Sequence, residues 1–464
     1  MYKKDRRLGE LNEKIKRKAH VKQSFSLDFL ERGTFTEYPY LEKTDMAYTF
    51  NFIDLFAGAG GLSEGFIRAG FTPIAHIEMN KYACDTLRSR MAYHYLKQHN
   101  RLEEYIKYLK EKQEGESGQK LWEKVPDEVI DSVINEEISD ETLADIFIKV
   151  DKLKGNKQVD FIIGGPPCQA YSIVGRARDP KNMKKDPRNF LYKYYLQFLK
   201  RYEPKMFVFE NVPGILSAQN GIHLENILKG IDKAGYKIEL KKLKASDYGV
   251  LQNRERVIIV GWRKELNLKY PELEKEENPY KILPDLFSDL PERQQGEGSL
   301  TDIVQYVAPA TGYLQQSKVR NSLDFTTQHI ARPHNLIDLE IYKRAIKLWL
   351  EKKARLNYAD LPPELQKHNN KQAFLNRFQV VNHEGCCHTV VAHIAMDGHY
   401  YIYPSLKQIR SITVREAARI QSFPDDYYFE GSRTAAFKQI GNAVPVILAE
   451  KIANKIKEQF TYEL

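Results

Sequence analysis

Short apolar runs separated by helical patterns dominate the sequence from residue 52 onward. We expect strands near residues 52–56, 73–77, 160–163, 206–209, 236–243 and 257–261, of which 236–243 interleaves apolar residues with Lys and Glu. Strands that alternate with helices are typical of a mainly parallel sheet that is covered by helices. The sequence therefore predicts an α/β fold of the Rossmann-like type, and such folds bind ligands at the carboxyl ends of their strands.

Two further stretches depart from this alternation. Residues 95–141 are rich in Lys, Glu and Asp, with Leu, Ile and Tyr at helical spacings, and are longer than a connection requires. They predict a charged helical insertion. After residue 261 the chain becomes rich in Pro, Glu and Gly, and then shows a helical pattern over residues 339–350. The alternating stretches 389–396 and 399–403 flank Asp397 and Gly398, which predicts a β-hairpin in a second, smaller domain.

Length and charge agree with a protein of more than one domain. The chain has 464 residues, of which 42% are hydrophobic, and its net charge of +9 suits a polyanionic partner. Nine Lys and Arg against three acidic residues in the first 22 positions give a local charge of +6, which predicts a basic arm over residues 1–49. Because the chain shows neither the apolar core of a signal peptide nor an apolar run of about 18 residues, we expect a soluble, cytoplasmic protein.

Cysteine and histidine spacing indicates neither a disulfide framework nor a metal centre. The four cysteines are Cys84, Cys168, Cys386 and Cys387, and no two of them are separated by two residues. Five histidines surround the last pair along the chain, but their spacings match no compact ligand set (His329, His334, His383, His388 and His393). We expect no metal.

One cysteine stands in an unusual context. The tract Gly-Gly-Pro-Pro-Cys-Gln-Ala-Tyr-Ser at residues 164–172 places Cys168 on a stiff turn directly after an apolar strand. Proline fixes the backbone and glycine permits close approach to a ligand, so a nucleophile would be exposed at the carboxyl edge of the sheet. A lone cysteine is more often a small buried apolar residue, so this tract alone does not decide between the two roles.

A second tract has the pattern of a nucleotide-type cofactor loop. The strand at residues 52–56 runs into a turn that contains Gly58, Gly60 and Gly61, and a helical pattern follows. Glycines there let a ligand approach the start of the first helix, and Glu78, after the next strand, is spaced to hydrogen-bond a ribose. An ordinary tight turn between a strand and a helix would also explain this tract on its own.

Three more tracts complete a recognisable set. They are Phe-Glu-Asn-Val-Pro-Gly at residues 209–214, Gln-Asn-Arg-Glu-Arg at 252–256, and Gln-Ile-Gly-Asn-Ala-Val-Pro at 439–445. With the two tracts above, the chain resembles the cytosine-5 methyltransferases, in the family's order, over roughly residues 52–261 and from residue 410 to the end. The resemblance is specific for the type of reaction and says little about the sequence that is recognised.

The resemblance implies a Rossmann-like S-adenosyl-L-methionine-dependent methyltransferase domain with a smaller target recognition domain. It divides the chain into the arm, a catalytic domain at residues 50–262, the target recognition domain at 263–409, and a segment at 410–464 that completes the catalytic domain. We expect site-specific DNA cytosine-5 methylation on double-stranded DNA, by a monomer with a cognate restriction endonuclease as a possible functional partner.

The resemblance also implies four catalytic roles. The Cys168 thiolate would add to carbon 6 of cytosine, and Glu210 would act at ring nitrogen 3. Arg256 would hydrogen-bond the carbonyl oxygen of the base, and Arg254 would stabilise the nucleophile loop or a phosphate. Glu210 could instead cap the following turn, and the two arginines could form ordinary salt bridges, for example with Glu255. The cytosine would have to leave the base stack to reach the thiolate.

On the cofactor side, the resemblance assigns Phe56 to the adenine ring and Glu78 to the ribose. Asp145 and Ile146 would read the adenine edge, although Asp140, Glu141 and Asp151 lie in the same charged stretch. Asn442 would close the pocket. The other expected cofactor-binding residues are those that flank these positions: Asp54, Gly58, Gly60, Gly61 and Met79.

The central region offers candidates for reading DNA, and the resemblance leaves two rival functions open. Arg suits guanine and phosphate, so four cations could contact DNA (Arg320, Arg332, Lys371 and Arg377). The charged insertion could also contact DNA, but its mixed charges favour a solvated excursion. Thr413 would cap the helix through which the chain re-enters the large domain. The rivals are a transfer-RNA cytosine-5 methyltransferase, disfavoured by the long central region, and a DNA-binding regulator without catalysis.

Overall fold

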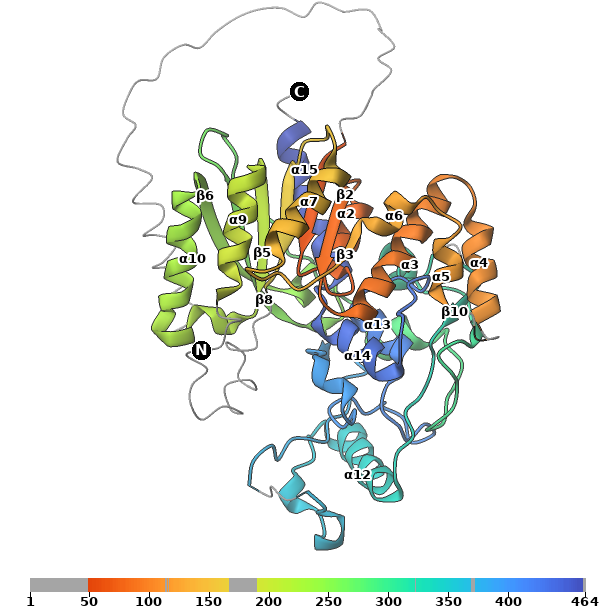
Figure 1. Ribbon diagram of the computed structural model, residues 1–464. Helices are drawn as coiled ribbons and strands as arrows, with labels where there is room; N and C mark the ends of the chain where they lie inside the picture. The colour runs from red at the N-terminus through yellow and green to blue at the C-terminus, as the bar shows by residue number, and fades with distance from the viewer. Residues whose placement is uncertain are drawn as a thin grey trace, which may run out of the picture.

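The core of the protein is one seven-stranded sheet. The computed structural model describes residues 49–112, 115, 117–166, 190–321, 323–368 and 372–461, so residues 1–48 of the basic arm, Cys168 and Lys371 lie outside the described residues. Neighbouring strands are parallel except where β8 pairs with β5 and β6. In spatial order the strands are β3 (Val133–Asn135), β2 (Thr72–Glu78), β1 (Asn51–Leu55), β4 (Phe161–Gly164), β5 (Met206–Asn211), β8 (Glu255–Arg263) and β6 (Tyr236–Lys244) (Figure 1).

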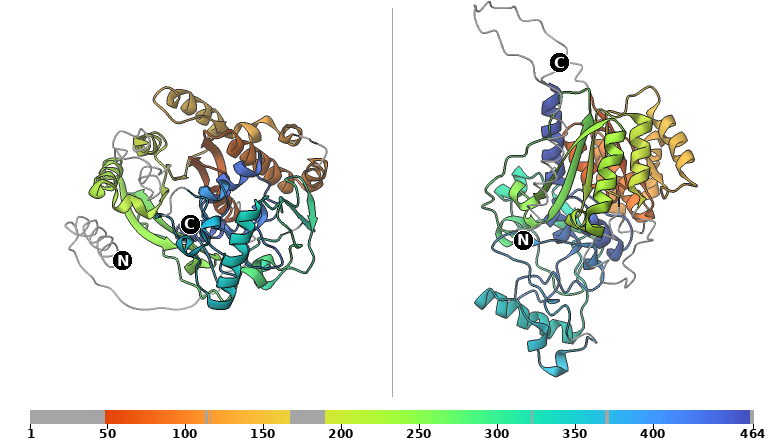
Figure 2. Two further views of the ribbon diagram at one scale, coloured as in Figure 1. Left: turned by 90° about the horizontal axis from the view of Figure 1, so that it is seen from below. Right: turned by 90° about the vertical axis from the view of Figure 1, so that its left-hand side faces the viewer.

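The six predicted strands are confirmed, each with bounds within two residues of the prediction. The central strands are mostly apolar because helices cover both faces of the sheet, whereas the edge strand β6 alternates between buried and more exposed residues. On one face lie α7 (Leu143–Lys154), α9 (Tyr192–Tyr202) and α10 (Ile222–Lys233), whose apolar side chains pack against alternate strand residues such as Ile53 and Leu55. On the other face α2 (Gly61–Arg68) and α15 (Val446–Thr461) cover Phe52 and its neighbours. The right-hand view of Figure 2 shows the blue α15 beside the sheet, opposite the green and yellow helices.

The charged stretch at residues 95–141 is not entirely helical. It contains the end of α3 (Lys81–Gln98), then α4 (Leu102–Glu111), α5 (Gly118–Trp122) and α6 (Asp127–Asp131), but it also supplies β3, the edge strand that pairs with β2. The prediction of a helical insertion is therefore wrong for Val133–Asn135. This strand is three residues long, too short to show a period, and it owes its conformation to the neighbouring strand.

The second lobe lies beyond the carboxyl edge of the sheet and is mostly irregular (Figure 1). Its longest element is α12 (Leu336–Lys352), which confirms the helix predicted at residues 339–350. The other elements of this lobe are short: η6 (Ile282–Phe287), β9 (Ile303–Gln305), α11 (Gly312–Gln316), β10 (Phe325–Thr327), η7 (Tyr358–Asp360), η8 (Pro363–Leu365), β11 (Cys387–His388) and η9 (Ala392–Ala395).

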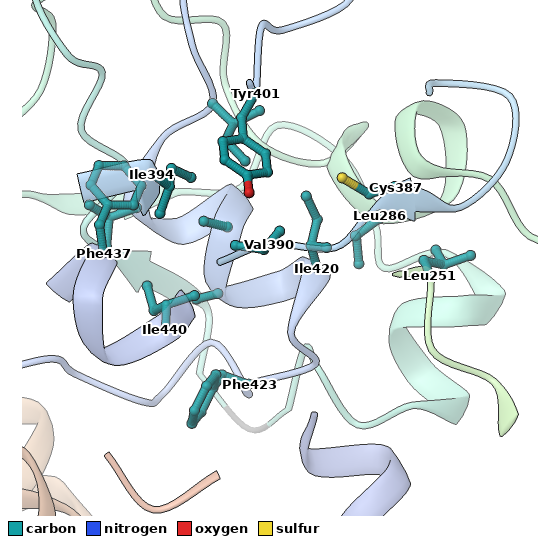
Figure 3. Close-up of a cluster of buried hydrophobic side chains, with 14 of the residues drawn as sticks. Leu251, Leu286, Cys387, Val390, Ile394, Tyr401, Ile420, Phe423, Phe437 and Ile440 are labelled. Carbon is teal, nitrogen blue, oxygen red and sulfur yellow. The ribbon is translucent and has the colours of Figure 1, made fainter. Parts of the chain in front are cut away.

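The hairpin predicted at residues 389–403 is wrong. β11 pairs with β7 (Gln252–Asn253), and η9 occupies the middle of the predicted first strand. Val390, Ile394 and Tyr401 instead bury their side chains against α13 (Val414–Ile420) and α14 (Arg433–Asn442), in the apolar cluster of Figure 3. Packing onto these helices has overridden the local alternating pattern.

The prediction that Thr413 caps a helix is confirmed. Thr413 caps α13: its side chain accepts a hydrogen bond from the Glu416 amide, and the Glu416 carboxylate accepts one from the Thr413 amide. This reciprocal capping box satisfies two amides that the helix leaves without partners. The three arginines of this region are fully buried (Arg410, Arg415 and Arg419).

Candidate active site

Strand register brings the predicted site residues to one edge of the sheet. Leu55 of β1 lies opposite Ile77 of β2 and Gly164 of β4, and Gly164 lies opposite Phe209 of β5. The chain positions that follow these strand ends are therefore neighbours. β8 runs in the opposite direction, so its first residues, including Arg256, enter at the same edge.

Residues 56–61, which we call the cofactor loop, have the backbone of a ligand-binding turn. The Gly58 amide donates to the Glu78 carboxylate at 2.9 Å, and the Asn80 amide donates to its other oxygen at 2.8 Å. Gly58 has a φ of 57°, and a side chain there would extend into open space. Gly61 cannot be replaced so easily, because its Cβ would lie 2.4 Å from the carbonyl oxygen of Val444, in the C-terminal motif.

Two carboxyl groups at this loop have raised pKa values. Burial raises the pKa of Asp54 well above its usual range, and the charge of Glu78 raises it further. Burial also raises the pKa of Glu78, although the amides of Asn80 and Gly58 oppose that shift. One buried oxygen of Asp54 has no hydrogen-bond partner among the described residues. A buried acceptor without a partner is costly, so this edge suits a ligand that donates hydrogen bonds, such as a ribose or an ammonium group.

The other half of the edge joins Glu210 to the segment that leads to Cys168. Arg256 forms an ion pair with Glu210, with 2.5 Å between Nε and Oε1. Gly165 lies directly against this carboxyl group: a Cβ on Gly165 would come within 2.6 Å of the Glu210 carbonyl oxygen and 2.7 Å of Oε2. The side-chain nitrogen Nδ2 of Asn211 donates to the carbonyl oxygen of Pro166 at 3.4 Å. The chain that enters the Cys168 tract is therefore fixed against the end of β5.

Arg254 and Arg256 have different surroundings. The Arg254 guanidinium is fully buried and donates to the carbonyl oxygens of Val390 (2.5 Å) and Gly441 (3.1 Å). Burial, and secondarily the charge of Arg256, hold the pKa of Arg254 well below its usual range. Arg254 thus ties the entrance of β8 to the second lobe and to the C-terminal motif, whereas Arg256 lies beside Glu210.

The remaining predicted cofactor residues lie in varied environments. Phe56 is half-buried, with a φ of 58°, and Met79 is exposed. Asp145 is exposed in the first turn of α7, whereas the side chain of Ile146 is completely buried between that helix and the sheet. The structure therefore does not bring the Ile146 side chain to the cofactor loop.

The C-terminal motif and β3 also reach this edge of the sheet. Asn442 is exposed at the end of α14. Asn135, at the end of β3, was missed by the sequence analysis: its side chain donates to the carbonyls of Glu78 (3.2 Å) and Met79 (3.0 Å). A signal for Asn135 would have required recognition of β3.

Three arginines that the sequence offered as DNA contacts use their guanidinium groups inside the protein. Arg320 pairs with Asp289, Arg332 donates to the carbonyls at the end of η9, and Arg377 donates to the carbonyls of residues 373 and 374. The interpretation of these side chains as readers of base edges is corrected accordingly. Their positive charges hold loops of the second lobe together.

The histidines of the second lobe have protein partners. His329 lies between the Thr413 hydroxyl (3.0 Å) and the carbonyl of Pro291 (2.8 Å), and His334 contacts the Ser411 hydroxyl (3.0 Å). Among the residues that the structure describes, there is no group of three or more His, Cys, Asp or Glu side chains that could hold a metal ion. In the same residues, the helices are too short or too polar to cross a lipid bilayer.

The fold and the edge described above define a class of protein. A Rossmann-like sheet with a glycine-rich loop after β1 and an acidic residue after β2 is a nucleotide-type cofactor site. Here the class is that of the S-adenosyl-L-methionine-dependent methyltransferases. Comparison with known proteins gives the family: the chain belongs to the C-5 cytosine-specific DNA methylases, whose family model matches residues 50–113 and 128–458.

Individual relatives agree with this membership. The chain is 40% identical to the type II methyltransferase M.Bpa9945I of Bacillus paralicheniformis over 439 residues, which cover 88% of this chain and 98% of that protein. It is 32% identical to the type II methyltransferase M.DdeI of Desulfomicrobium norvegicum, over 88% of this chain and 89% of that protein.

A crystal structure of a putative DNA modification methyltransferase encoded within a prophage (E. coli) shares the fold, with a TM-score of 0.57 and 23% identity over 89% of this chain and all of that chain. The predicted family, fold class, enzyme class and cofactor are confirmed. The protein is a DNA (cytosine-5-)-methyltransferase that uses S-adenosyl-L-methionine.

Proposed function

We propose that the protein is a site-specific modification methyltransferase of a type II restriction–modification system, and that it methylates carbon 5 of a flipped-out cytosine through a covalent adduct with Cys168. The names of the two relatives above support the type II assignment. The observation that carries the chemistry is the Glu210–Arg256 pair, which lies against Gly165 three residues before Cys168.

The proposed reaction begins with sulfur. The Cys168 thiolate forms a bond to carbon 6, and the electron pair of the 5,6 double bond is accommodated as Glu210 gives a proton to ring nitrogen 3. The resulting enamine makes carbon 5 nucleophilic. Bound S-adenosyl-L-methionine supplies an electrophilic methyl group. Carbon 5 takes that methyl group, and the electron pair of the broken sulfur–methyl bond stays with the departing cofactor as a neutral thioether. A solvent base then removes the proton of carbon 5 while the Cys168 sulfur leaves as thiolate. Ring nitrogen 3 returns its proton to Glu210, and the aromatic ring is restored.

Arg256 orients Glu210 before the base arrives. Its ion pair holds the carboxyl group at the strand end, where ring nitrogen 3 would be placed. We expect Arg256 to move from the carboxylate to the carbonyl oxygen of the cytosine, which frees Glu210 to share its proton. Arg254 would act from behind, because its bonds to Val390 and Gly441 hold the strand entrance that presents Arg256.

The residues of the cofactor loop fit S-adenosyl-L-methionine. Glu78, held by two backbone amides, would accept from the ribose hydroxyls, and Phe56 would pack on the adenine. Asp54, with its free oxygen, Gly58, Gly60, Gly61, Met79 and Asn442 would line the same site. For the adenine edge, the positions that directly follow β3 are better placed than Ile146, whose side chain is enclosed.

The domain division at residues 50–262, 263–409 and 410–464 accompanies this proposal. The sheet and the second lobe would clamp duplex DNA between them, and the cytosine would swing out, at a cost of a few kcal/mol, into the edge that holds Glu210. We propose that the enzyme acts as a monomer in the cytoplasm, with a cognate endonuclease as its functional counterpart.

The decisive experiment is a methylation map. The purified protein is incubated with S-adenosyl-L-methionine and unmethylated plasmid, alongside unmodified transfer RNA, and both are sequenced after bisulfite conversion. One short recurring methylated DNA sequence is expected, whereas methylation confined to RNA would contradict the proposal.

Cysteine variants test the covalent step. Cys168→Ser should reduce transfer by at least about 1,000-fold, because serine is far less acidic and less nucleophilic. Cys386→Ser serves as the matched control and should keep normal activity, since Cys386 lies against the backbone of Val250. Full activity of Cys168→Ser would refute the covalent mechanism.

A further inference from the structure

The cofactor loop is attached to a residue at the opposite end of the chain. The hydroxyl of Tyr427 donates to the carbonyl oxygen of Ala59 at 2.5 Å, across 368 positions of sequence. A Cβ on Gly60 would come within 3.0 Å of the same hydroxyl, so the backbone of the loop rests directly on this side chain. Tyr427 is buried, and the contact is therefore protected from water.

Two hydrogen bonds attach the loop to β2. The Ala57 amide donates to the carbonyl of Ile77 at 3.1 Å, and the Gly58 amide donates to Glu78. These two bonds hold the first half of the loop. The Tyr427 bond holds the second half, immediately before α2 begins at Gly61.

A buried charge cluster fixes Tyr427 in turn. Arg90 of α3 places its guanidinium 4.7 Å from the centre of the Tyr427 ring and pairs with Asp426 at 2.8 Å. The same guanidinium pairs with Glu64, in the first turn of α2, at 2.6 Å. Buried ion pairs are favourable only with good geometry and complete hydrogen bonding, so this cluster restricts Tyr427 to one position.

The charged stretch after α3 encloses this cluster. Tyr105 of α4 donates to the carbonyl of Asp426 at 2.7 Å, and Lys112, at the end of α4, pairs with Glu430 at 2.8 Å. The stretch is therefore attached to residues 426–430 by buried polar contacts. The interpretation of this stretch as a solvated excursion is therefore wrong, because its helices pack against residues 426–430.

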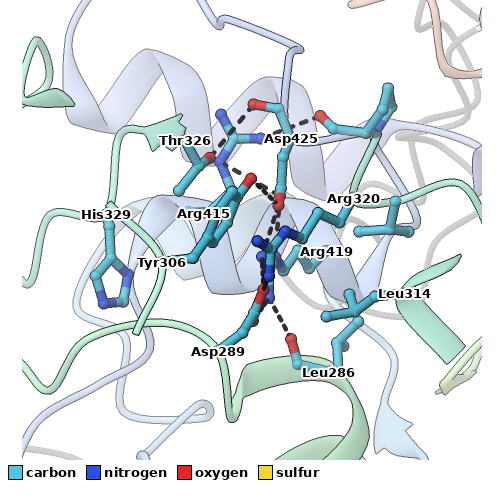
Figure 4. Close-up of polar contacts among 12 residues, drawn as sticks. Leu286, Asp289, Tyr306, Leu314, Arg320, Thr326, His329, Arg415, Arg419 and Asp425 are labelled. Atoms are coloured by element: carbon cyan, nitrogen blue, oxygen red, sulfur yellow. Dashed lines mark hydrogen bonds and ion pairs between the residues drawn. The ribbon is translucent and has the colours of Figure 1, made fainter. Parts of the chain in front are cut away.

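Asp425, which precedes Asp426 and Tyr427, connects this part of the chain to the second lobe. Asp425 accepts from Arg419 at 2.9 and 2.6 Å and from the Tyr306 hydroxyl at 2.8 Å, and Arg419 also pairs with Asp289 (Figure 4). Three consecutive residues thus contact the second lobe, the α3–α4 region and the cofactor loop. A shift of residues 425–427 would therefore disturb contacts with the second lobe, the α3–α4 region and the cofactor loop.

We propose that Tyr427 is a positioning residue for methyl transfer: held by Arg90 and Asp426, it fixes the second half of the cofactor loop for S-adenosyl-L-methionine. The inference rests on the assignment of residues 56–61 as the cofactor loop. Tyr427 need not touch the cofactor, because it acts through the Ala59 carbonyl. Tyr427 and Glu78 thus hold the same loop at different residues: Glu78 at Gly58, and Tyr427 at Ala59.

Calorimetric titration of the full-length protein with S-adenosyl-L-methionine tests the proposal. Tyr427→Phe removes one hydroxyl and leaves the Ala59 carbonyl without that donor, so the Kd should rise about tenfold. Tyr428→Phe is the matched control, because its ring packs among the tyrosines of α3 and α4, and its Kd should stay within about twofold of the wild type.

Steady-state kinetics separates positioning from general destabilisation. Tyr427→Phe should raise KM for S-adenosyl-L-methionine while KM for DNA and the kcat at saturating cofactor stay close to wild type. An unchanged cofactor Kd in a folded Tyr427→Phe protein would overturn the inference. The Glu78→Gln variant shows whether the cofactor loop itself has been assigned correctly. If Glu78→Gln also leaves the cofactor Kd unchanged, the assignment of the cofactor loop fails. If Glu78→Gln raises the cofactor Kd and Tyr427→Phe does not, only the role proposed for Tyr427 is refuted.

Hydrogen exchange of the wild-type protein provides a test that needs no variant. Because coupling between two parts of a molecule is reciprocal, cofactor binding should slow amide exchange both in residues 56–66 and in residues 424–430. Protection of the first segment without the second would contradict the proposed attachment.

Discussion

Replacement of Gly165 by alanine tests how tightly the Cys168 tract must lie against Glu210. The new Cβ would stand 2.6 Å from the Glu210 carbonyl oxygen and 2.7 Å from Oε2. The carboxylate could rotate away, but the carbonyl belongs to the backbone of β5, which is paired with β4 and β8. The segment at residues 164–166 would therefore have to yield by about 0.8 Å to reach ordinary van der Waals contact.

A displacement of that size should slow methyl transfer substantially. Misplacement of reacting groups by about 1 Å costs on the order of 100-fold in rate, or about 2.7 kcal/mol of transition-state stabilisation. We expect Gly165→Ala to lower kcat by about that factor. The Kd for S-adenosyl-L-methionine should stay unchanged, because the cofactor loop is attached elsewhere.

The assay is single-turnover methyl transfer from labelled cofactor to DNA that contains the mapped site. Gly312→Ala is the control, because a Cβ there meets its nearest neighbour, the Tyr280 hydroxyl, at 3.6 Å. Normal single-turnover rates in a folded Gly165→Ala protein would refute the view that close packing against Glu210 positions the nucleophile tract.

Two predictions concern stability. Burial lowers the pKa of His329 from 6.5 to about 4, so between these pH values the ring is neutral in the folded protein and protonated in the unfolded chain. The free energy of unfolding should therefore fall as the pH drops from 6.5 towards 4, by at most about 3 kcal/mol from this group. Urea unfolding across that pH range should show a shallower loss in His329→Gln than in the exposed control His99→Gln, and equal slopes would contradict the assignment. Thr413→Ala removes a buried helix cap and should lower the free energy of unfolding by about 1–2 kcal/mol. The exposed cap variant Ser432→Ala should cost less, and a reversed order in chemical denaturation would contradict this ranking.

The sheet could be predicted from the sequence because strands that are buried on both faces consist mostly of apolar residues. Continuous apolar runs such as residues 206–209 occur where both faces of a strand are covered, whereas the edge strand β6 showed apolar residues interleaved with Lys and Glu. Val133–Asn135 showed neither pattern, since three residues cannot show a period and the strand depends on its pairing with β2. The hairpin expected around Gly398 failed because Val390, Ile394 and Tyr401 pack onto helices that lie far along the chain.

The roles of charged residues were harder to predict because their partners are distant in sequence. Arg419 pairs with Asp289, which is 130 positions away, and Arg320 pairs with the same carboxylate. An arginine that reads a base and an arginine that fixes a loop look identical until the partner is known. Tyr427 gave no signal at all, because its chemistry lies in one hydrogen bond to a backbone carbonyl. The roles of Cys168, Arg254, Asp145 and Asn442 stay predictions.

The closure of the sheet by α15 has a consequence for how the protein is made. Residues 446–461 cover the sheet face that contains Phe52 and Phe161, together with Phe66 of α2, and Gly65 lets α2 approach Ala449 so closely that a Cβ would lie 2.4 Å from it. On the ribosome, the strands that form first must wait until residues 446–461 have been made before this face is shielded. Nascent chains should therefore present a large aromatic surface to chaperones, and methyl transfer should begin only once translation has passed α15. Co-expression of residues 1–430 with a separate peptide that contains α15 would be a means of switching the enzyme on after synthesis.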